Sequence, residues 1–409
     1  MLQIQNPRER FIVGLADAGL RAVSVLRRRG APPAPGAARR ILVLRLERIG
    51  DLMMSLPALH AIQRLAPHAE IDLVVGGWNR DLAALIPGMT RIETMDAPWL
   101  SRGRGGQSWP ALMRQARGWR QHRYDVALNL EGDIRSNILL GLSGAGWTAG
   151  FGMAGGGPML DRVVAFDTTS HTAVNGVRLV EAALGEASLA ATPGHGRAYA
   201  SALPRLGLDV PADARAEADA ALGISPQSPA PRFLLGVHVG AGRAVKEWPE
   251  ERTAAVAARV ATERGATLVL TGSADDRAAA DRLRAALPSG MPVIDLVGRL
   301  GLLPLAATLQ RLTALITPDT GPMHLAAVLG TPLVAVFGPS SPDRWGPLGD
   351  RCRIVRIDLP CSPCNRIRNP PARCVGHTPD CLALIGVDLV HQALESLLDQ
   401  TPWQEGTRP

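Results

Sequence analysis

Aromatic side chains and long apolar runs are scarce in this sequence. Phe, Trp and Tyr make up 4% of the 409 residues, which argues against a surface on which single-stranded bases stack. No apolar run reaches the roughly 18 residues that a membrane-spanning helix needs. The first residues also lack the apolar stretch and the small-residue cleavage site of a secretory signal. We therefore expect a cytoplasmic location.

Cysteine is confined to the end of the sequence, at positions 352, 361, 364, 374 and 381, which is not how a disulfide framework is spread. Two common phosphate-binding patterns, Gly-x-x-x-x-Gly-Lys-Ser/Thr and Gly-x-Gly-x-x-Gly, are absent. No recognisable nucleic-acid-binding module is present, so nucleic acid is not an expected partner.

The composition suits two packed α/β domains. Hydrophobic residues make up 46% and charged residues 20%, as in globular proteins, and 409 residues exceed what one core usually holds. Lys and Arg number 44 against 37 Asp and Glu. This positive excess suits nucleic acid, an anionic membrane surface or phosphorylated small molecules.

Residues 1–38 are predicted to form a basic amphipathic helix, over 8–29, followed by a Pro-rich linker at 31–38. Arginines crowd the second half of this helix. Its apolar side chains gather near one face: Phe11, Ile12, Leu15, Ala22, Val25 and Leu26. Two interpretations are open, a helix packed on the body of the protein and a helix lying on an anionic membrane surface.

Strands alternate with helices after the linker. Residues 41–46 form a continuous apolar strand typical of a buried parallel sheet. A helix at 51–65 and strands at 71–75 and 125–130 follow, and the Gly-rich tract at 141–157 is expected to be a loop. This order predicts a doubly wound domain over 39–205.

A second series follows a Pro- and Ala-rich segment at 206–231, which we interpret as an inter-domain linker. Its strands lie at 233–239 and 266–272 and its helices at 250–263, 276–287 and 322–329. The sequence therefore predicts an α/β fold with two Rossmann-like domains, the second spanning 232–409.

Three strand ends carry glycine-containing motifs, and an open α/β sheet binds ligands at the carboxyl ends of its strands. In the first motif, Gly50 allows a sharp turn and Asp51 falls near the N-terminus of the next helix. Asp51 has two interpretations. It is a helix cap, the commonest role of Asp there, or a general base whose ionised form the helix N-terminus favours.

The second motif is the loop after the strand at 233–239. Gly240, Ala241 and Gly242 would let backbone N–H groups approach an anion, and Arg243 and Lys246 add positive charge. A surface turn explains the pattern about as well.

The third motif opens a helix. Asp319, Thr320 and His324 converge on the positive end of that helix, which begins at Gly321. This convergence favours a functional role over a purely structural cap.

These motifs resemble glycosyltransferase family 9, the heptosyltransferases that build the inner core of lipopolysaccharide. The resembling blocks lie at 41–75, 240–250, 270–276 and 319–347. The resemblance implies a GT-B fold, with two Rossmann-like domains facing a central cleft. It also implies inverting transfer of heptose or a similar sugar from an ADP-sugar to a lipopolysaccharide inner-core acceptor. No metal or other cofactor is implied for catalysis, and the sequence contains no Asp-x-Asp pair.

Carried over by position, the resemblance implies that Asp51 deprotonates the acceptor hydroxyl and Lys246 neutralises the diphosphate. Asp319 would hold the sugar hydroxyls. The remaining donor-binding residues would be Gly240, Ala241, Arg243, Thr320, Gly321, His324 and either Asp275 or Asp276. A lipid-embedded acceptor would bring the enzyme to the cytoplasmic face of the inner membrane.

The cysteines have the spacing of four metal ligands. Cys361, Cys364, Cys374 and Cys381 could hold a structural zinc or iron, and some members of the family that modify autotransporter proteins have similar Cys-rich tails. Reduced, metal-free thiols and disulfides are the alternatives.

Two other functions are open. Sugar transfer to a protein or another glycan has the cysteines as its only hint. A non-catalytic nucleotide-sugar-binding protein is disfavoured by the presence of Asp51, Lys246 and Asp319 together, because a binder needs no base.

Overall fold

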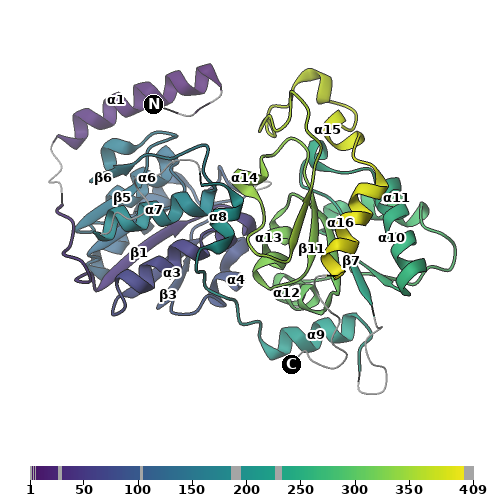
Figure 1. Cartoon of the computed structure of the whole chain (residues 1–409). Coiled ribbons are helices and arrows are strands. Elements are labelled where there is room, and N and C mark those ends of the chain that lie inside the picture. The colour runs from purple at the N-terminus through teal and green to yellow at the C-terminus, as the bar shows by residue number, and fades with distance from the viewer. Residues whose placement is uncertain are drawn as a thin grey trace. The chain divides into compact units, whose positions relative to one another are not determined.

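The computed structural model describes residues 2, 4, 6–25, 30–101, 105–185, 195–225 and 233–399. The chain divides into two units, Met1–Leu208 and Asp209–Pro409, each built around a six-stranded parallel sheet (Figure 1). The predicted α/β fold with two Rossmann-like domains is therefore confirmed. Leu26, the arginines at 27–29 and the boundary residues 226–232 lie outside the described residues.

The sheet of the first unit has the strand order β3-β2-β1-β4-β5-β6. Its strands are β1 (Arg40–Arg45), β2 (Glu70–Val75), β3 (Arg91–Thr94), β4 (Val126–Asn129), β5 (Trp147–Phe151) and β6 (Arg162–Val164). β1 is buried from its second residue onward and β4 throughout. Both are apolar because helices cover both faces of a parallel sheet.

Helices pack against this sheet in pairs, α3 with α7 and α5 with α6. Leu42 and Leu44 of β1 share one hydrophobic cluster with Leu112 of α5 and Leu139 of α6. The helices are α1 (Pro7–Ser24), α2 (Ile49–Met54), α3 (Leu56–Leu65), α4 (Arg80–Ala84), α5 (Trp109–Gly118), α6 (Ile134–Leu142), α7 (Thr172–Leu184) and α8 (Arg197–Ala202), with 3-10 turns η1 (Gly77–Asn79), η2 (Trp119–His122) and η3 (Gly157–Met159).

The sheet of the second unit has the order β12-β11-β10-β7-β8-β9. Its strands are β7 (Leu234–His238), β8 (Thr267–Thr271), β9 (Val293–Asp295), β10 (Ala314–Pro318), β11 (Leu333–Val336) and β12 (Cys352–Val355). Leu235 and Val237 of β7 share a core with Val256 and Val260 of α10 and with Leu394 of α16.

Helices α10, α11 and α16 pack together on that core, and α12 packs against α9 and α13. The helices of this unit are α9 (Ala212–Ala221), α10 (Glu250–Arg264), α11 (Arg277–Ala285), α12 (Leu302–Arg311), α13 (Gly321–Val328), α14 (Pro342–Trp345), α15 (Asp380–Ala383) and α16 (Val387–Asp399), with 3-10 turns η4 (Ala244–Lys246), η5 (Ala274–Asp276) and η6 (Ala372–Cys374).

The Gly-rich tract at 141–157 is not a loop, because it contains β5. A Cβ built on Gly150 would lie 3.1 Å from Leu160 Cδ1 and 3.2 Å from Asn129 Cβ. Glycine therefore lets β5 lie close to its neighbours, although glycine is unusual inside a strand and hides the strand pattern.

The helix predicted over 51–65 is two helices that meet at Ser55. The Ser55 hydroxyl donates to the carbonyl oxygen of Asp51 at 2.8 Å, and Pro57 in the first turn of α3 has no N–H to continue α2. The segment 206–231 contains α9, in which Asp219 forms a two-point ion pair with Arg311 of α12, both contacts at 2.7 Å. Among the helices that the structure describes, none has the length and apolar character needed to cross a bilayer.

Candidate active site

Each sheet has one point at which its strand order reverses, and an open α/β sheet binds its ligands there. This point lies between β1 and β4 in the first unit and between β7 and β10 in the second. Asp51 follows β1, whereas Lys246 follows β7 and Asp319 follows β10. The first sequence motif therefore lies at one switch point, and the second and third motifs lie together at the other.

Lys246 and Asp319 form an ion pair in the second unit. The Nζ atom of Lys246 lies 2.9 Å from Oδ2 of Asp319, and the two side chains are 16% and 12% exposed. Their attraction is stronger than that of a surface pair because water is largely excluded. Lys246 is also the single lysine among the 44 Lys and Arg residues of this chain. The compact ammonium group of lysine, as opposed to the planar guanidinium of arginine, thus occurs at this one place.

The loop before Lys246 depends on Gly240. Its φ angle is +79°, and a Cβ on this residue would lie 1.9 Å from Oδ1 of Asp276, so a side chain does not fit. The next N–H group, of Ala241, donates to Oε1 of Glu247 at 3.2 Å. A carboxylate of the protein thus holds an N–H group that the sequence assigned to an anionic ligand.

The third motif places the first turn of α13 beside this loop. Thr320 is the N-cap residue of α13, and its side chain makes no capping hydrogen bond. Its hydroxyl lies 3.4 Å from that of Thr317, and His324 is buried. The helix therefore begins at Gly321 without a cap from Thr320, which suits an anion at its positive end.

The remaining predicted donor residues differ in environment. Oδ2 of Asp276 accepts hydrogen bonds from the Ser273 N–H group at 2.7 Å and from the Ser273 hydroxyl at 2.6 Å. Asp276 thus supports η5 while lying against Gly240. Asp275 and Arg243 are exposed, and the structure does not bring either of them into the Lys246–Asp319 pair.

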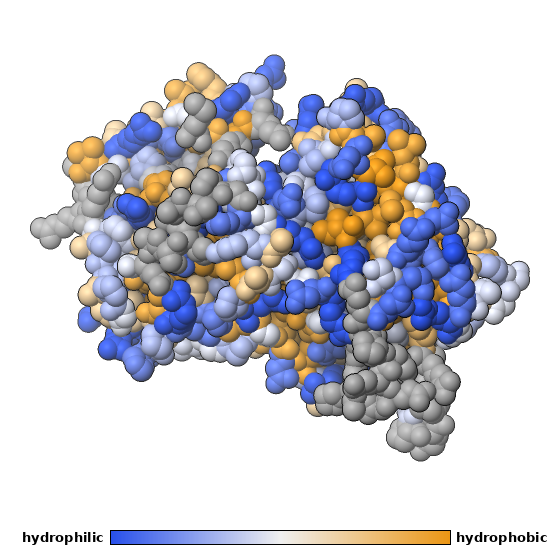
Figure 2. All heavy atoms as spheres, viewed as in Figure 1, coloured by the Kyte–Doolittle hydropathy of each residue, from blue (hydrophilic) through white to orange (hydrophobic). Residues whose placement is uncertain are grey.

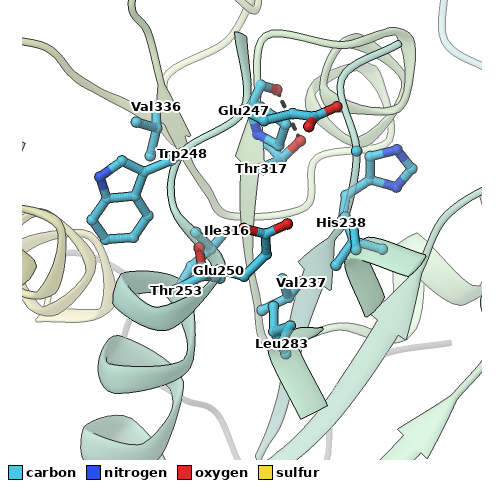
Figure 3. Close-up of a pocket in the computed structure, with 14 residues that line it drawn as sticks. Val237, His238, Glu247, Trp248, Glu250, Thr253, Leu283, Ile316, Thr317 and Val336 are labelled. Carbon is cyan, nitrogen blue, oxygen red and sulfur yellow. Dashed lines mark hydrogen bonds between the residues drawn. The ribbon is translucent and has the colours of Figure 1, made fainter. Parts of the chain in front are cut away.

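A small cavity of about 40 Å³ adjoins the site. Figure 3 shows Trp248 and His238 on opposite sides of it, with Glu250 and Thr317 between them. Such a volume holds water but falls below the roughly 300 Å³ of small-molecule sites. Burial lowers the pKa of His238 to about 4, so this ring is neutral near pH 7. The sequence singled out neither Glu247 nor His238.

Asp51 is the third residue of α2 in the first unit. Its Oδ2 accepts a hydrogen bond from the Arg48 N–H group at 3.1 Å, so the N-cap residue of α2 is Arg48 and not Asp51, which the cap interpretation had placed there. Its Oδ1 lies 3.7 Å from Nη2 of Arg45, and the side chain is 28% exposed. Since a carboxylate has about four lone-pair sites, these contacts leave Asp51 able to accept a further hydrogen bond.

Arg45 holds the loop that carries Asp51. This residue is 3% exposed. Its Nε donates to the carbonyl oxygen of Asp51 at 3.0 Å, and its Nη1 donates to Oε2 of Glu47 at 2.8 Å and to the carbonyl oxygen of Leu130 at 2.6 Å. Arg45 thereby ties the loop after β1 to the end of β4. An arginine inside the apolar run at 41–46 was the overlooked signal.

Glu131 lies beside Arg45 and is buried, with 4% of its surface exposed. Its Oε1 accepts from the Leu46 N–H group, whereas Oε2 is buried without a hydrogen-bond partner among the described residues. Burial raises the pKa of Glu131 to about 7, and burial and Asp51 raise the pKa of Glu47. The single positive charge of Arg45 thus lies beside the carboxyl groups of both Glu47 and Glu131 and cannot neutralise two negative charges. Glu131 follows β4 as Glu47 follows β1, a parallel that the sequence already contained.

The four predicted metal ligands are free thiols. Cys361 is exposed, Cys364 and Cys374 are half-buried, and Cys381 is buried. Burial and the three neighbouring cysteines raise the pKa of Cys381 to about 11.

The four cysteines lie in one region, but their sulfur atoms are not drawn together as tightly as the ligands of a bound metal. Among the described residues, one group of three or more His, Cys, Asp or Glu side chains brings its ligand atoms within 4.8 Å of one another, and it consists of Glu263, His391 and Glu395. In a closed tetrahedral site, sulfurs bonded to zinc would be about 3.8 Å apart. The structural zinc or iron at these four cysteines stays a prediction from their spacing.

Comparison with known proteins identifies the family. The model of glycosyltransferase family 9 (heptosyltransferase) matches residues 112–373. Lipopolysaccharide heptosyltransferase 2 of Salmonella typhimurium is 28% identical over 337 residues, which cover 78% of this chain and 88% of that protein.

Two solved structures match both units. The Escherichia coli ADP-heptose lipopolysaccharide heptosyltransferase II superposes with a TM-score of 0.70 at 25% identity, covering 88% of this chain and 99% of the other. The family 9 glycosyltransferase of Veillonella parvula superposes with a TM-score of 0.73 at 25% identity, covering 89% and 98%.

Proposed function

The chain belongs to glycosyltransferase family 9, and we propose that it transfers heptose, or a similar sugar, from an ADP-sugar to a lipopolysaccharide inner-core acceptor. The observation that carries the proposal is the Lys246–Asp319 pair at the switch point of the second unit. The relatives support the choice of substrates, since they include a lipopolysaccharide heptosyltransferase and an ADP-heptose lipopolysaccharide heptosyltransferase.

The donor binds at the second switch point. Without a ligand, Asp319 neutralises Lys246 and Glu247 accepts from the Ala241 N–H group. A diphosphate offers both groups a more highly charged acceptor. Lys246 then moves to the diphosphate, and Asp319 is left to accept hydrogen bonds from the sugar hydroxyls. The N-terminus of α13 adds its partial positive charge to the same diphosphate.

The transfer takes one step. Asp51 accepts the proton of the acceptor hydroxyl while that oxygen forms its bond to the anomeric carbon. The bond from the anomeric carbon to the diphosphate breaks on the opposite side, so the configuration inverts. ADP leaves with the bonding electron pair, and Lys246 stabilises the charge that develops on it. Arg45 is a positioning residue, because it holds the Asp51 backbone and lies beside Oδ1.

Turnover tests the proposal. Purified protein is incubated with ADP-, UDP- and GDP-sugars and a heptose-less lipopolysaccharide acceptor, and nucleotide release is followed with and without EDTA. We expect ADP release from ADP-heptose that EDTA does not change, because Lys246 and α13 take the place of a metal. Release that stops with EDTA and returns with a divalent cation would contradict the metal-independent mechanism.

The single lysine gives an independent test of the donor site. An amine-reactive reagent can modify one side chain in this protein, Lys246. We expect ADP to protect Lys246 from modification, as judged by peptide mass spectrometry, with the modified N-terminal amine as the internal control. Equal labelling with and without saturating ADP would contradict the assignment of Lys246.

The same measurements separate the other functions. ADP-sugar binding without turnover on lipopolysaccharide would direct the search to a protein acceptor, whereas binding without turnover on any acceptor would indicate a nucleotide-sugar-binding protein. Absence of binding would refute the donor.

A further inference from the structure

Helix α1 presents its apolar side outward. Phe11 is 68% exposed, Ile12 65% and Leu15 60%. The opposite side faces the protein: Oδ1 of Asp17 accepts from the Gly156 N–H group at 2.6 Å, and Val13 packs against Gly155. A surface helix normally buries its apolar stripe and exposes its charges. In α1 a carboxylate faces inward, and large apolar side chains face outward.

This outward face is separate from the core of the first unit. α1 packs against η3. A groove of about 580 Å³ on this inner side of the helix is lined by Asp17 and Arg21 of α1, Pro158 of η3 and Val163 of β6, and its lining does not include the outward Phe11, Ile12 or Leu15. Figure 2 shows hydrophobic atoms over α1. Val25, directly after the helix, is 82% exposed. Grouped exposed apolar side chains of this kind mark an interaction surface.

The charge around this surface identifies its partner. Arg8, Arg10 and Arg21 of α1 are exposed, and the sequence continues with three further arginines at 27–29. Two acidic residues, Glu9 and Asp17, oppose these six arginines, and Asp17 faces inward. Apolar side chains flanked by arginine suit the boundary between lipid head groups and acyl chains, where anionic lipids attract each basic residue.

We propose that the outward face of α1 docks on an anionic bilayer surface. Phe11, Ile12 and Leu15 enter the head-group layer, and the exposed Arg8, Arg10 and Arg21 contact lipid phosphates. The helix has 18 residues and lies in the plane of the surface. This inference does not depend on the donor or on the reaction of the active site.

Vesicle flotation with the full chain tests the proposal. Wild-type protein is mixed with phosphatidylcholine vesicles that contain or lack phosphatidylglycerol, at low and high salt. We expect flotation with the anionic vesicles, and weaker flotation at high salt because salt screens the arginines. The Phe11→Ser/Leu15→Ser variant should float at least about tenfold more weakly, because two large apolar side chains no longer enter the lipid.

Matched variants separate a loss of docking from misfolding. Leu384→Ser removes an apolar side chain of similar exposure (62%) from the second unit and should float like wild type. Arg8→Gln/Arg10→Gln should weaken the preference for anionic lipid while α1 keeps its apolar face. Circular dichroism and thermal unfolding confirm that the variants are folded.

Three outcomes would overturn the proposal. The first is wild-type protein that does not float with the vesicles. The second is a Phe11→Ser/Leu15→Ser variant that floats as well as wild type. The third is wild-type protein that forms a dimer and does not float, together with a Phe11→Ser/Leu15→Ser variant that is a monomer. The last outcome would assign the face to a second copy of the chain. Turnover of a delipidated acceptor is measured in parallel, so that a failure of docking and a failure of the proposed reaction are distinguished.

Discussion

Lys246 supplies the one lysine ammonium group of this chain, and it does so at the proposed donor site. Its ammonium group lies 2.9 Å from Asp319 at the second switch point, and no other lysine exists in the sequence. The sequence predicted both residues, because each follows a recognisable strand. It could not predict that they pair, since residues far apart in the chain meet only when the order of β7 and β10 in the sheet is known.

Replacement of Lys246 should reduce turnover more than stability. We expect Lys246→Met to lower kcat/KM for the ADP-sugar by roughly 10²- to 10³-fold, because the leaving diphosphate loses its cation. Lys246→Arg should recover part of this loss, since it restores the charge but not the compact ammonium group. Steady-state kinetics on both variants provide the measurement. A Lys246→Met enzyme within about threefold of wild type would contradict the assigned role.

Glu131 should make stability fall as pH rises. Burial raises the pKa of this residue from 4.5 to about 7 in the folded protein. Between these values the folded protein holds a proton that the unfolded chain has released, so the free energy of unfolding decreases with rising pH. As pH rises through this range, the free energy of unfolding of Glu131→Gln should fall by about 1 to 3 kcal/mol less than that of wild type.

Urea unfolding at pH 5.5, 7 and 8.5 measures this effect. Glu251→Gln, at an exposed position of α10, serves as the control and should keep the wild-type slope. An unchanged slope in Glu131→Gln would show that this carboxyl does not carry the proton. The sequence missed Glu131 because burial of a carboxyl group beside Arg45 depends on the packing of β1 against β4.

Elements with continuous apolar runs could be predicted from the sequence, whereas glycine-rich elements could not. β1 and β7 are buried strands at the predicted positions, because parallel strands covered on both faces consist of apolar residues. β5 was missed since Gly150 packs within its sheet through close approach rather than through a side chain. The outward face of α1 was recognisable as amphipathic, but its direction follows from the Asp17–Gly156 contact.

The cysteine-rich segment makes a prediction at the scale of an element. Cys361, Cys364 and Cys374 are at least partly exposed, whereas Cys352 and Cys381 are buried. A thiol reagent should therefore modify the first three rapidly in the folded protein and the other two after unfolding. Burial also keeps Cys381 protonated and unreactive.

A bound metal would instead protect the thiols of its four ligands from the reagent. Four thiols that resist the reagent until a chelator is added, together with about one equivalent of zinc or iron by elemental analysis, would establish the structural site that the Cys spacing predicts. Rapid reaction without a chelator would exclude such a site in the isolated protein. Cys361→Ser identifies which peptide carries the first modification.

At the scale of the whole molecule, two doubly wound units carry separate parts of the proposed chemistry. The base follows β1 in one unit, and the donor-binding groups follow β7 and β10 in the other. Strand–helix alternation in the sequence was sufficient to predict both units, because local apolar patterns determine the elements. The motif residues could be placed at strand ends, whereas the contacts made by Arg45, Glu131 and Glu247 depend on tertiary packing.

The central claim is that Asp51 supplies the base while the second unit binds the donor. Isothermal titration of ADP and single-turnover transfer from ADP-heptose, both with Asp51→Asn, test it most directly. We predict unchanged ADP affinity and a roughly 10²- to 10⁴-fold slower transfer, because the amide cannot accept the proton and general-base catalysis contributes a factor of this size. Transfer by Asp51→Asn at a rate within about threefold of wild type would contradict the account.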